Sequence, residues 1–210
     1  MTLFNDLIDG YRRFRETCWV DQRERWKQLS HAQSPKVMII GCSDSRVDPA
    51  QIFDTSPGEI FAVRNVAALV PPFETAPGYH GVSAALEFAV TQLKVEEIVV
   101  MGHGECGGCQ AALHSAFDGA VPGEGGFISH WVGLLDEARD GVIAKHGEGE
   151  DALHAMEHAA IRVSLANLRT FPFVVEREQA GTLTLRGAWF AIRTGVLHLL
   201  DNATGEFNAA

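Results

Sequence analysis

The chain has 210 residues, a length that suits one compact α/β domain and leaves little room for two separate ones. Its hydrophobic content of 46% and charged content of 21% exclude a disordered chain. Because 27 acidic residues outnumber 17 basic ones, the formal net charge of −10 disfavours nucleic acid and anionic membranes as partners and favours a small substrate.

The first residues, MTLFNDLIDGYRR, mix acidic with apolar side chains and lack the apolar core and cleavage site of a secretory signal. No stretch approaches the roughly 20 apolar residues that a membrane span needs. We therefore expect a cytoplasmic protein. In that compartment the cysteines are thiols or metal ligands rather than disulfide partners: Cys18, Cys42, Cys106 and Cys109.

Residues 3–30 place apolar side chains three or four positions apart, a spacing that predicts an amphipathic helical arm before the first strand. The stripe consists of Leu3, Leu7, Tyr11, Phe14 and Cys18. Periodicity alone does not decide whether such an arm packs on its own domain or on another subunit. We expect a single domain over 1–210, with the arm over 1–32 and an α/β core over 33–210.

Three short apolar segments predict buried strands in the core, over residues 37–41, 59–65 and 96–103. Residues 79–94, between the second and third segments, have helical spacing. Because strands and helices alternate in this part of the chain, we expect a mainly parallel sheet.

After the third strand the pattern predicts helices over residues 107–117, 128–145 and 151–170, with a Gly/Pro-rich loop over 120–126. Segments 182–192 and 196–201 then predict a hairpin, which adds an antiparallel strand. The predicted fold is α/β: a mainly parallel central sheet of four strands with an added antiparallel edge strand, flanked by helices and preceded by the helical arm.

Three potential metal ligands follow the predicted strands. Cys42 comes directly after the first strand, and His103 ends the third, with Cys106 three residues later. Ligands of an open parallel sheet gather at the carboxyl ends of its strands, so these side chains can converge. Two thiolates and one imidazole suit Zn²⁺ and leave a fourth position for water. A cysteine after a strand is usually an inert small hydrophobe, so Cys42 alone would not support a metal site.

Asp44 and Arg46 lie beside Cys42 in the segment CSDSR. Burying both charges at a strand end would cost several kcal/mol unless each had a partner, so we expect the two side chains to pair. Such a pair is often an ordinary surface salt bridge. Its position next to a candidate ligand favours a role at the site.

Three motifs in order resemble the β-class carbonic anhydrases: CSDSR at 42–46, PGEIFAVRNVAALVPP at 57–72 and GHGECGG at 102–108. The resemblance runs from about Gln33 to the end of the chain. It implies a zinc enzyme that catalyses the reversible hydration of carbon dioxide to bicarbonate and a proton by a zinc-bound hydroxide. The implied ligands of the one Zn²⁺ per subunit are Cys42, His103 and Cys106.

The resemblance also implies a role for the charged pair. Asp44 would accept the hydrogen bond of the hydroxide, or replace the hydroxide on zinc in an inactive closed state. Arg46 would hold Asp44 in place and keep it ionised. Because two thiolates cancel the charge of Zn²⁺, the bound water should be less acidic than at a three-histidine site, and activity should rise toward alkaline pH.

A small substrate pocket follows from the same resemblance. It assigns Gln33 as a donor to a substrate oxygen, Phe61, Val66 and Phe88 as apolar walls, and the backbone amide of Gly107 to a bound anion. Taken singly, the apolar residues would be assigned to the core. In the family, some pocket residues come from a neighbouring subunit, which implies a homodimer or dimer of dimers with the arm around its partner.

The chain is more similar to the plant-type branch of the family. Some bacterial members bind bicarbonate at a non-catalytic site through a Trp, a Tyr and an Arg, and here Ile39, Phe190 and Arg64 occupy the corresponding positions. Neither Ile39 nor Phe190 donates a hydrogen bond. We therefore expect that bicarbonate does not lock this protein in the closed state.

Two other motifs compete with this interpretation. His154, Glu157 and His158 fit H-x-x-E-H, an inverted zinc-protease pattern, but a short pattern recurs by chance and a solvated helix face is favoured. Cys109 forms C-x-x-C with Cys106, which suggests redox chemistry or a structural zinc site, whereas packing is favoured.

Two other functions also stay open. A lyase on the same scaffold could act on CS₂ or COS, and access to the pocket would decide between these substrates. A non-catalytic zinc- or bicarbonate-binding module is disfavoured, because a structural zinc needs no Asp44, Arg46 or Gln33.

Overall fold

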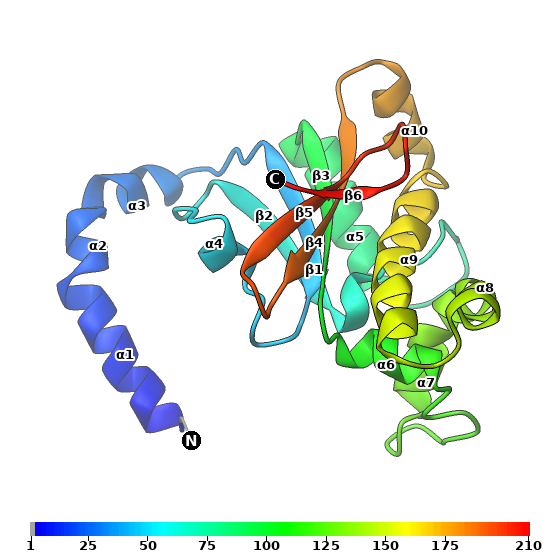
Figure 1. Ribbon diagram of the computed structural model, residues 1–210. Coiled ribbons are helices and arrows are strands. Elements are labelled where there is room, and N and C mark those ends of the chain that lie inside the picture. Colours follow the sequence, from blue (N-terminus) through cyan, green and yellow to red (C-terminus); the bar gives the residue numbers. More distant parts are fainter. Residues whose placement is uncertain (1–2) are drawn as a thin grey trace. The chain divides into compact units, whose positions relative to one another are not determined.

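The computed structural model describes residues 3–210, which form two compact units divided between Ser34 and Pro35 (Figure 1). The first unit contains α1 (Phe4–Glu16), α2 (Cys18–Asp21) and α3 (Arg23–Leu29). The predicted arm is thus helical but broken at Thr17 and Gln22, and its residues 1–2 lie outside the described range. No residue of these helices is buried within the chain.

The second unit is built on a six-stranded sheet with the strand order β2-β1-β3-β4-β5-β6. The strands are β1 (Val37–Cys42), β2 (Ile60–Asn65), β3 (Glu97–His103), β4 (Thr184–Ala191), β5 (Val196–Leu200) and β6 (Phe207–Ala209). The first four are parallel, as predicted, and β4 and β5 form the predicted antiparallel hairpin.

The edge of the sheet differs from the prediction. β6 pairs antiparallel with β5, so two antiparallel strands are added instead of one. The short segment Phe207–Ala209 has no alternation that marks it as a strand; only the exposed edge of β5 makes it one.

The remaining elements lie between the strands. They are α4 (Pro49–Ile52), the 3₁₀ turn η1 (Val66–Ala68), α5 (Gly81–Glu87), the π-helical turn η2 (Phe88–Leu93), α6 (Gly107–Leu113), α7 (Gly126–Val132), the 3₁₀ turn η3 (Gly133–Leu135), α8 (Asp136–His146), α9 (Glu150–Leu168) and α10 (Pro172–Gln179).

Two of these elements depart from the sequence prediction. The helix predicted over 107–117 ends at Leu113, and the backbone reaches a left-handed conformation at Ser115 (φ 48°). Helix α10 was not predicted, and Pro172 begins it, because a proline at the first helical position loses no hydrogen bond.

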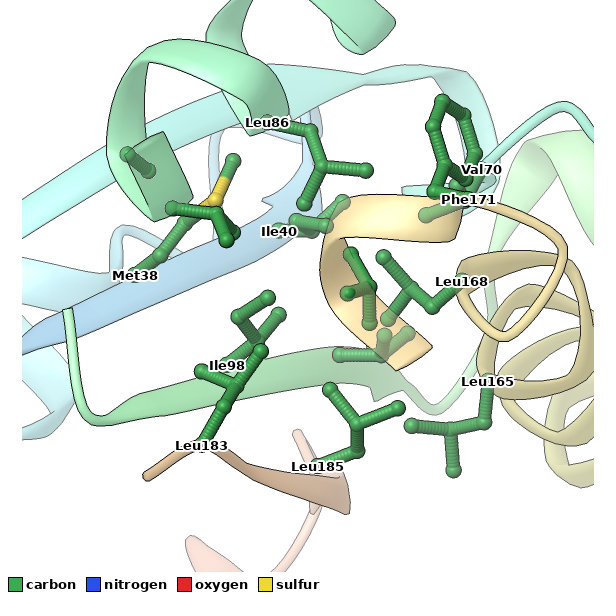
Figure 2. Packing of buried hydrophobic residues seen from close by; sticks show 14 of the residues in the cluster. Met38, Ile40, Val70, Leu86, Ile98, Leu165, Leu168, Phe171, Leu183 and Leu185 are labelled. Carbon is green, nitrogen blue, oxygen red and sulfur yellow. The ribbon is translucent and has the colours of Figure 1, made fainter. Parts of the chain in front are cut away.

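Helices bury one face of the sheet. Met38 and Ile40 of β1 and Ile98 of β3 pack with Leu86 of α5 and Leu168 of α9 in one hydrophobic cluster (Figure 2). Each fully buried aliphatic side chain of this kind contributes about 1.5–3 kcal/mol. Because a slip of one residue would turn these side chains to the other face, their burial holds β1 and β3 in register.

The order of the strands makes the chain connections diverge at one end of the sheet. From β1 the chain continues to β2 on one side and then crosses to β3 on the other, so the connections diverge at the carboxyl ends of β1 and β3. Gly41 pairs with Met101 in this register, which brings Cys42 and His103 to the same end.

Helix α9 approaches β3 closely at this end. A Cβ on Gly102 would lie 2.8 Å from Cδ1 of Ile161, so only glycine fits beneath the helix there. Within residues 3–210 no helix combines the length and apolarity that crossing a bilayer requires.

Candidate metal centre

Cys42, His103 and Cys106 form a buried cluster at the carboxyl ends of β1 and β3. Their potential ligand atoms all lie within 4.8 Å of one another, and no other such group of three or more occurs among residues 3–210. The two sulfurs are 4.0 Å apart. Tetrahedral Zn²⁺ with Zn–S bonds of about 2.3 Å would separate its sulfurs by about 3.8 Å, so the spacing fits this ion.

The histidine is oriented for metal binding. Its Nδ1 lies 2.8 Å from the carbonyl oxygen of Gly104, and because a carbonyl only accepts, Nδ1 carries the proton. His103 Nε2 is buried and has no hydrogen-bond partner. An unpaired buried nitrogen is costly, and a cation at this point would satisfy its lone pair.

The two thiols require a cation in order to ionise. The Cys106 sulfur and burial raise the pKa of Cys42 to about 12, and the Cys109 sulfur is the largest influence raising the pKa of Cys106 to about 12. At neutral pH they become thiolates only when a metal replaces their protons. The donor set therefore fits Zn²⁺.

Asp44 and Arg46 form the expected pair. The Arg46 side chain donates from Nε and Nη2 to the two carboxylate oxygens, at 2.9 and 2.7 Å, and the Arg46 backbone N–H donates to Oδ1 at 2.9 Å. Arg46 holds the pKa of Asp44 well below its usual range. Arg46 Nη2 also donates to the carbonyl oxygen of Glu105 (3.0 Å), which joins this loop to the one between His103 and Cys106.

The carbonic anhydrase family model matches residues 37–197 of this chain. The chain belongs to the β-class carbonic anhydrase family. Members of this family are zinc-dependent lyases that interconvert carbon dioxide and bicarbonate.

Individual β-class enzymes match most of the chain. A carbonic anhydrase of Pseudomonas aeruginosa is 36% identical over 204 residues, which cover 96% of this chain and 90% of that protein. The chloroplastic β carbonic anhydrase 5 of Arabidopsis thaliana is 36% identical over 190 residues, 90% of this chain but only 62% of the longer plant protein. The solved β-carbonic anhydrase CcaA has a TM-score of 0.90 and 32% identity, covering 98% of both chains.

The pocket residues expected from the family lie on different parts of the chain. Val66, in η1, is 39% exposed and borders α6, because a Cβ on Gly108 would lie 2.7 Å from its Cγ1. The rings of Phe61 and Phe88 pack together at 5.8 Å, and Phe88 is 45% exposed. Assigning Val66 and Phe88 to the core would have been wrong.

The other two expected pocket residues are also exposed. Gly107 is the first residue of α6, and Gln33 follows α3 in the N-terminal unit. Their roles toward substrate stay predictions.

Arg64 braces the metal-site loop. Its guanidinium donates to the carbonyl oxygens of Cys42 (2.8 Å) and Asp44 (2.6 Å) and to the carboxylate of Asp48 (2.9 Å). Ile39 is 2% exposed within β1. With these donors engaged, Arg64 supports the loop, and insensitivity to bicarbonate stays a prediction.

Sequence reasoning missed Glu157. This residue is 3% exposed in α9 rather than part of a solvated face, and its carboxylate accepts from the Cys106 backbone N–H at 3.0 Å. The signal was available, because Glu157 shares a helical face with the buried residues Ile161 and Ser164. Among residues 3–210, the competing protease pattern forms no metal site, since Glu157 and the histidines His154 and His158 belong to no cluster that could hold a metal.

Cys109 is buried, in agreement with the expected packing role.

Proposed function

We propose that this chain catalyses the reversible hydration of carbon dioxide to bicarbonate and a proton, with one Zn²⁺ per subunit held by Cys42, His103 and Cys106. The observation that carries the proposal is the buried triad of ligands next to an ion pair that a purely structural zinc would not need. When bound, the zinc supplies a Lewis acid that lowers the pKa of water at its open position.

Asp44 orients the attacking water in this proposal. An ionised carboxylate accepts hydrogen bonds and donates none, so Asp44 accepts a hydrogen bond from the attacking oxygen and leaves a lone pair of that oxygen directed at carbon dioxide. The bonds from Arg46 set the plane of the carboxylate. In the proposed closed state Asp44 would turn to the metal and block the reaction, which requires breaking those bonds.

The proposed pocket is shared between subunits. Phe61 packs against the hydrophobic cluster of Met38 and Ile40, which is separate from the cluster that contains Cys42, and the Phe88 ring contacts Phe61. This separation supports the assignment of the aromatic pair to the pocket of a neighbouring subunit. Val66 and the amide of Gly107 would line the pocket of their own subunit. Apolar walls with few donors suit the apolar, quadrupolar substrate.

A homodimer or dimer of dimers follows from this division. Exposed large apolar residues, among them Phe73, Phe88, Leu7 and Tyr11, mark surfaces that a second copy would cover. β-Carbonic anhydrases of Sordaria macrospora, 26% identical with a TM-score of 0.79, are described as tetrameric. We place the enzyme in the cytoplasm, because free thiol ligands are maintained in a reducing compartment.

Stopped-flow carbon dioxide hydration, run beside zinc analysis, tests the proposal. The wild type should hold one zinc per chain and be active, with activity increasing toward alkaline pH. Asp44→Asn should keep the zinc and lose most activity. The amide has one acceptor oxygen in place of two, so it cannot accept from Arg46 at both positions and also from the attacking oxygen. A zinc-loaded wild type without hydration activity would favour a non-catalytic binding module.

A further inference from the structure

Glu157 is one of the few charged side chains buried in the described chain. Its Oε1 accepts from the backbone N–H of Cys106 at 3.0 Å, and its Oε2 accepts from the indole Nε1–H of Trp189 at 3.0 Å. The two residues that donate lie on different elements, the start of α6 and strand β4. Glu157 therefore links α9 and β4 to the loop that contains a metal ligand.

We propose that Glu157 is a positioning residue for the zinc ligand Cys106, an inference that rests on the proposed zinc enzyme. Cys106 is the N-cap of α6 and has an extended backbone (φ −72°, ψ 115°). Its N–H is bonded to the Cα that bears the ligating side chain. A fixed acceptor on that N–H therefore limits the directions in which the Cys106 sulfur can point.

Helix α9 gives Glu157 a fixed position. Ile161, one turn after Glu157, fills the space above Gly102 in β3 and Gly187 in β4, where added Cβ atoms would lie 2.8 and 2.9 Å from it. This close approach leaves α9 little freedom to slide along the sheet. The carboxylate of Glu157 therefore keeps a fixed position, along the direction of the strands, relative to the end of β3.

The two histidines of the H-x-x-E-H segment support the other bond of Glu157. His154 and His158 pack against the Trp189 ring with centroid distances of 4.7 and 5.3 Å, and His198 contacts it from β5 at 5.3 Å. With the indole enclosed, its N–H keeps the carboxylate turned toward Cys106. The segment thus supports the metal loop rather than forming a second metal site.

The experiment compares zinc retention in matched variants. Glu157→Ala removes both acceptors, whereas Glu157→Gln keeps an oxygen for Cys106 but places an amide group against the Trp189 donor. Ser164→Ala is the control, because Ser164 is buried on the same helix and bonds only to the Ala68–Val70 backbone at 3.2 Å. Zinc transfer to a chromophoric chelator, thermal melting and the thiolate absorption of the cobalt-substituted protein are measured for each.

Outer-shell partners of metal ligands change metal affinity by about 10–100-fold. We expect zinc release to accelerate by about that factor in Glu157→Ala and less in Glu157→Gln, with a shifted cobalt–thiolate band in both. Ser164→Ala should release zinc at the wild-type rate despite losing stability.

Wild-type zinc release and an unchanged cobalt band in Glu157→Gln would overturn the proposal. Equal acceleration in Ser164→Ala at an equal loss of melting temperature would also overturn it, because the effect would then reflect general destabilisation. If Glu157→Ala does not fold, the zinc release and the cobalt band of Glu157→Gln decide whether the proposal holds. A wild type that holds zinc without hydrating carbon dioxide would contradict the proposed activity while leaving the zinc-release comparison decisive.

Discussion

At the scale of single residues, the metal loop is organised by arginines. Arg64 binds the backbone of the segment that contains Cys42 and Asp44, and Arg46 binds the Asp44 carboxylate and the Glu105 carbonyl. These side chains donate from planar guanidinium groups, which bond several acceptors in a fixed geometry. The position of Asp44 is thus determined by donors on both sides of the loop.

Replacing Arg46 should reduce activity and raise the pKa of Asp44. In Arg46→Ala, Asp44 loses the partner that depresses its pKa, so its protonation range moves upward toward the ordinary value near 4. Carbon dioxide hydration should fall by about 100-fold, because a misplaced orienting group costs about that much. Stopped-flow kinetics measures the rate, and an NMR titration of the Asp44 carboxyl should show protonation at a higher pH than in the wild type.

Arg46→Lys is the matched variant. It keeps the charge but not the two parallel bonds, so Arg46→Lys should lower the pKa of Asp44 again without restoring the rate. A lysine variant with full activity would contradict the geometric role of Arg46.

At the scale of elements, α6 and η1 are packed so closely that glycine is required between them. A Cβ on Gly108 would lie 2.7 Å from Val66 and 2.9 Å from the Cβ of Ala67, whereas a Cβ on Gly107 would meet nothing within 4 Å. Ala67 already has a left-handed backbone (φ 62°), so this turn has little freedom to adjust.

Gly108→Ala should therefore destabilise the protein and disturb Val66. We expect a loss of about 1–3 kcal/mol in the free energy of unfolding, typical of an overpacked site, and a lower hydration rate. Gly107→Ala provides the control for stability, and denaturant unfolding should place it close to the wild type. Equal stability of the two variants would contradict the close packing of α6 on η1.

The half-buried His158 in α9 makes folding sensitive to acid. Burial, with the charges of His154, Arg162 and His198 nearby, lowers the pKa of His158 to about 3, whereas an unfolded histidine titrates near 6.5. Between these values the unfolded chain binds a proton that the folded chain excludes. Stability should therefore fall as pH decreases from about 6.5 toward about 3.

His158→Phe should weaken that dependence. The phenyl ring can occupy the place of the imidazole on Phe207, with which it stacks at 3.9 Å, without a proton to bind. Melting temperatures measured from pH 7 to pH 4 should decline less steeply than in the wild type. His146→Phe, at an exposed position of α8, should keep the wild-type slope, and a common slope for all three proteins would refute the explanation.

At the scale of the whole molecule, the arm presents an apolar stripe that its own unit leaves uncovered. Leu7 is 59% exposed and Tyr11 is 56% exposed. Such a stripe is typical of a helix that completes its packing against another chain. Assembly and catalysis are then connected, because the proposed pocket also draws on two subunits.

Leu7→Glu should therefore lower the oligomeric mass measured by sedimentation and reduce carbon dioxide hydration in parallel. The matched control is Asp9→Ala, which alters the polar side of the same helix, where Asp9 forms an exposed ion pair with Arg12. The control should keep the wild-type mass. An unchanged mass for Leu7→Glu would exclude the arm from the interface.

The sequence by itself determined the first five strands, the candidate ligands and the charged pair, because each has a local signature. Apolar β-branched runs predict buried strands, and residues that follow them meet at one end of a parallel sheet. Cys42, His103 and Cys106 converge for this reason, and Asp44 pairs with Arg46 two positions away. Family motifs then supplied the chemistry.

Only the tertiary structure decided which groups support that site. Glu157 reaches Cys106 across 51 positions of sequence, β6 exists because β5 leaves an edge, and Arg64 braces the loop that contains Cys42 and Asp44. Local spacing could indicate that Glu157 is buried, but it does not give the partner in any of these contacts, since each depends on how distant elements pack. The H-x-x-E-H segment has a zinc motif in sequence, but burial turns its carboxylate toward a backbone amide and its histidines toward Trp189.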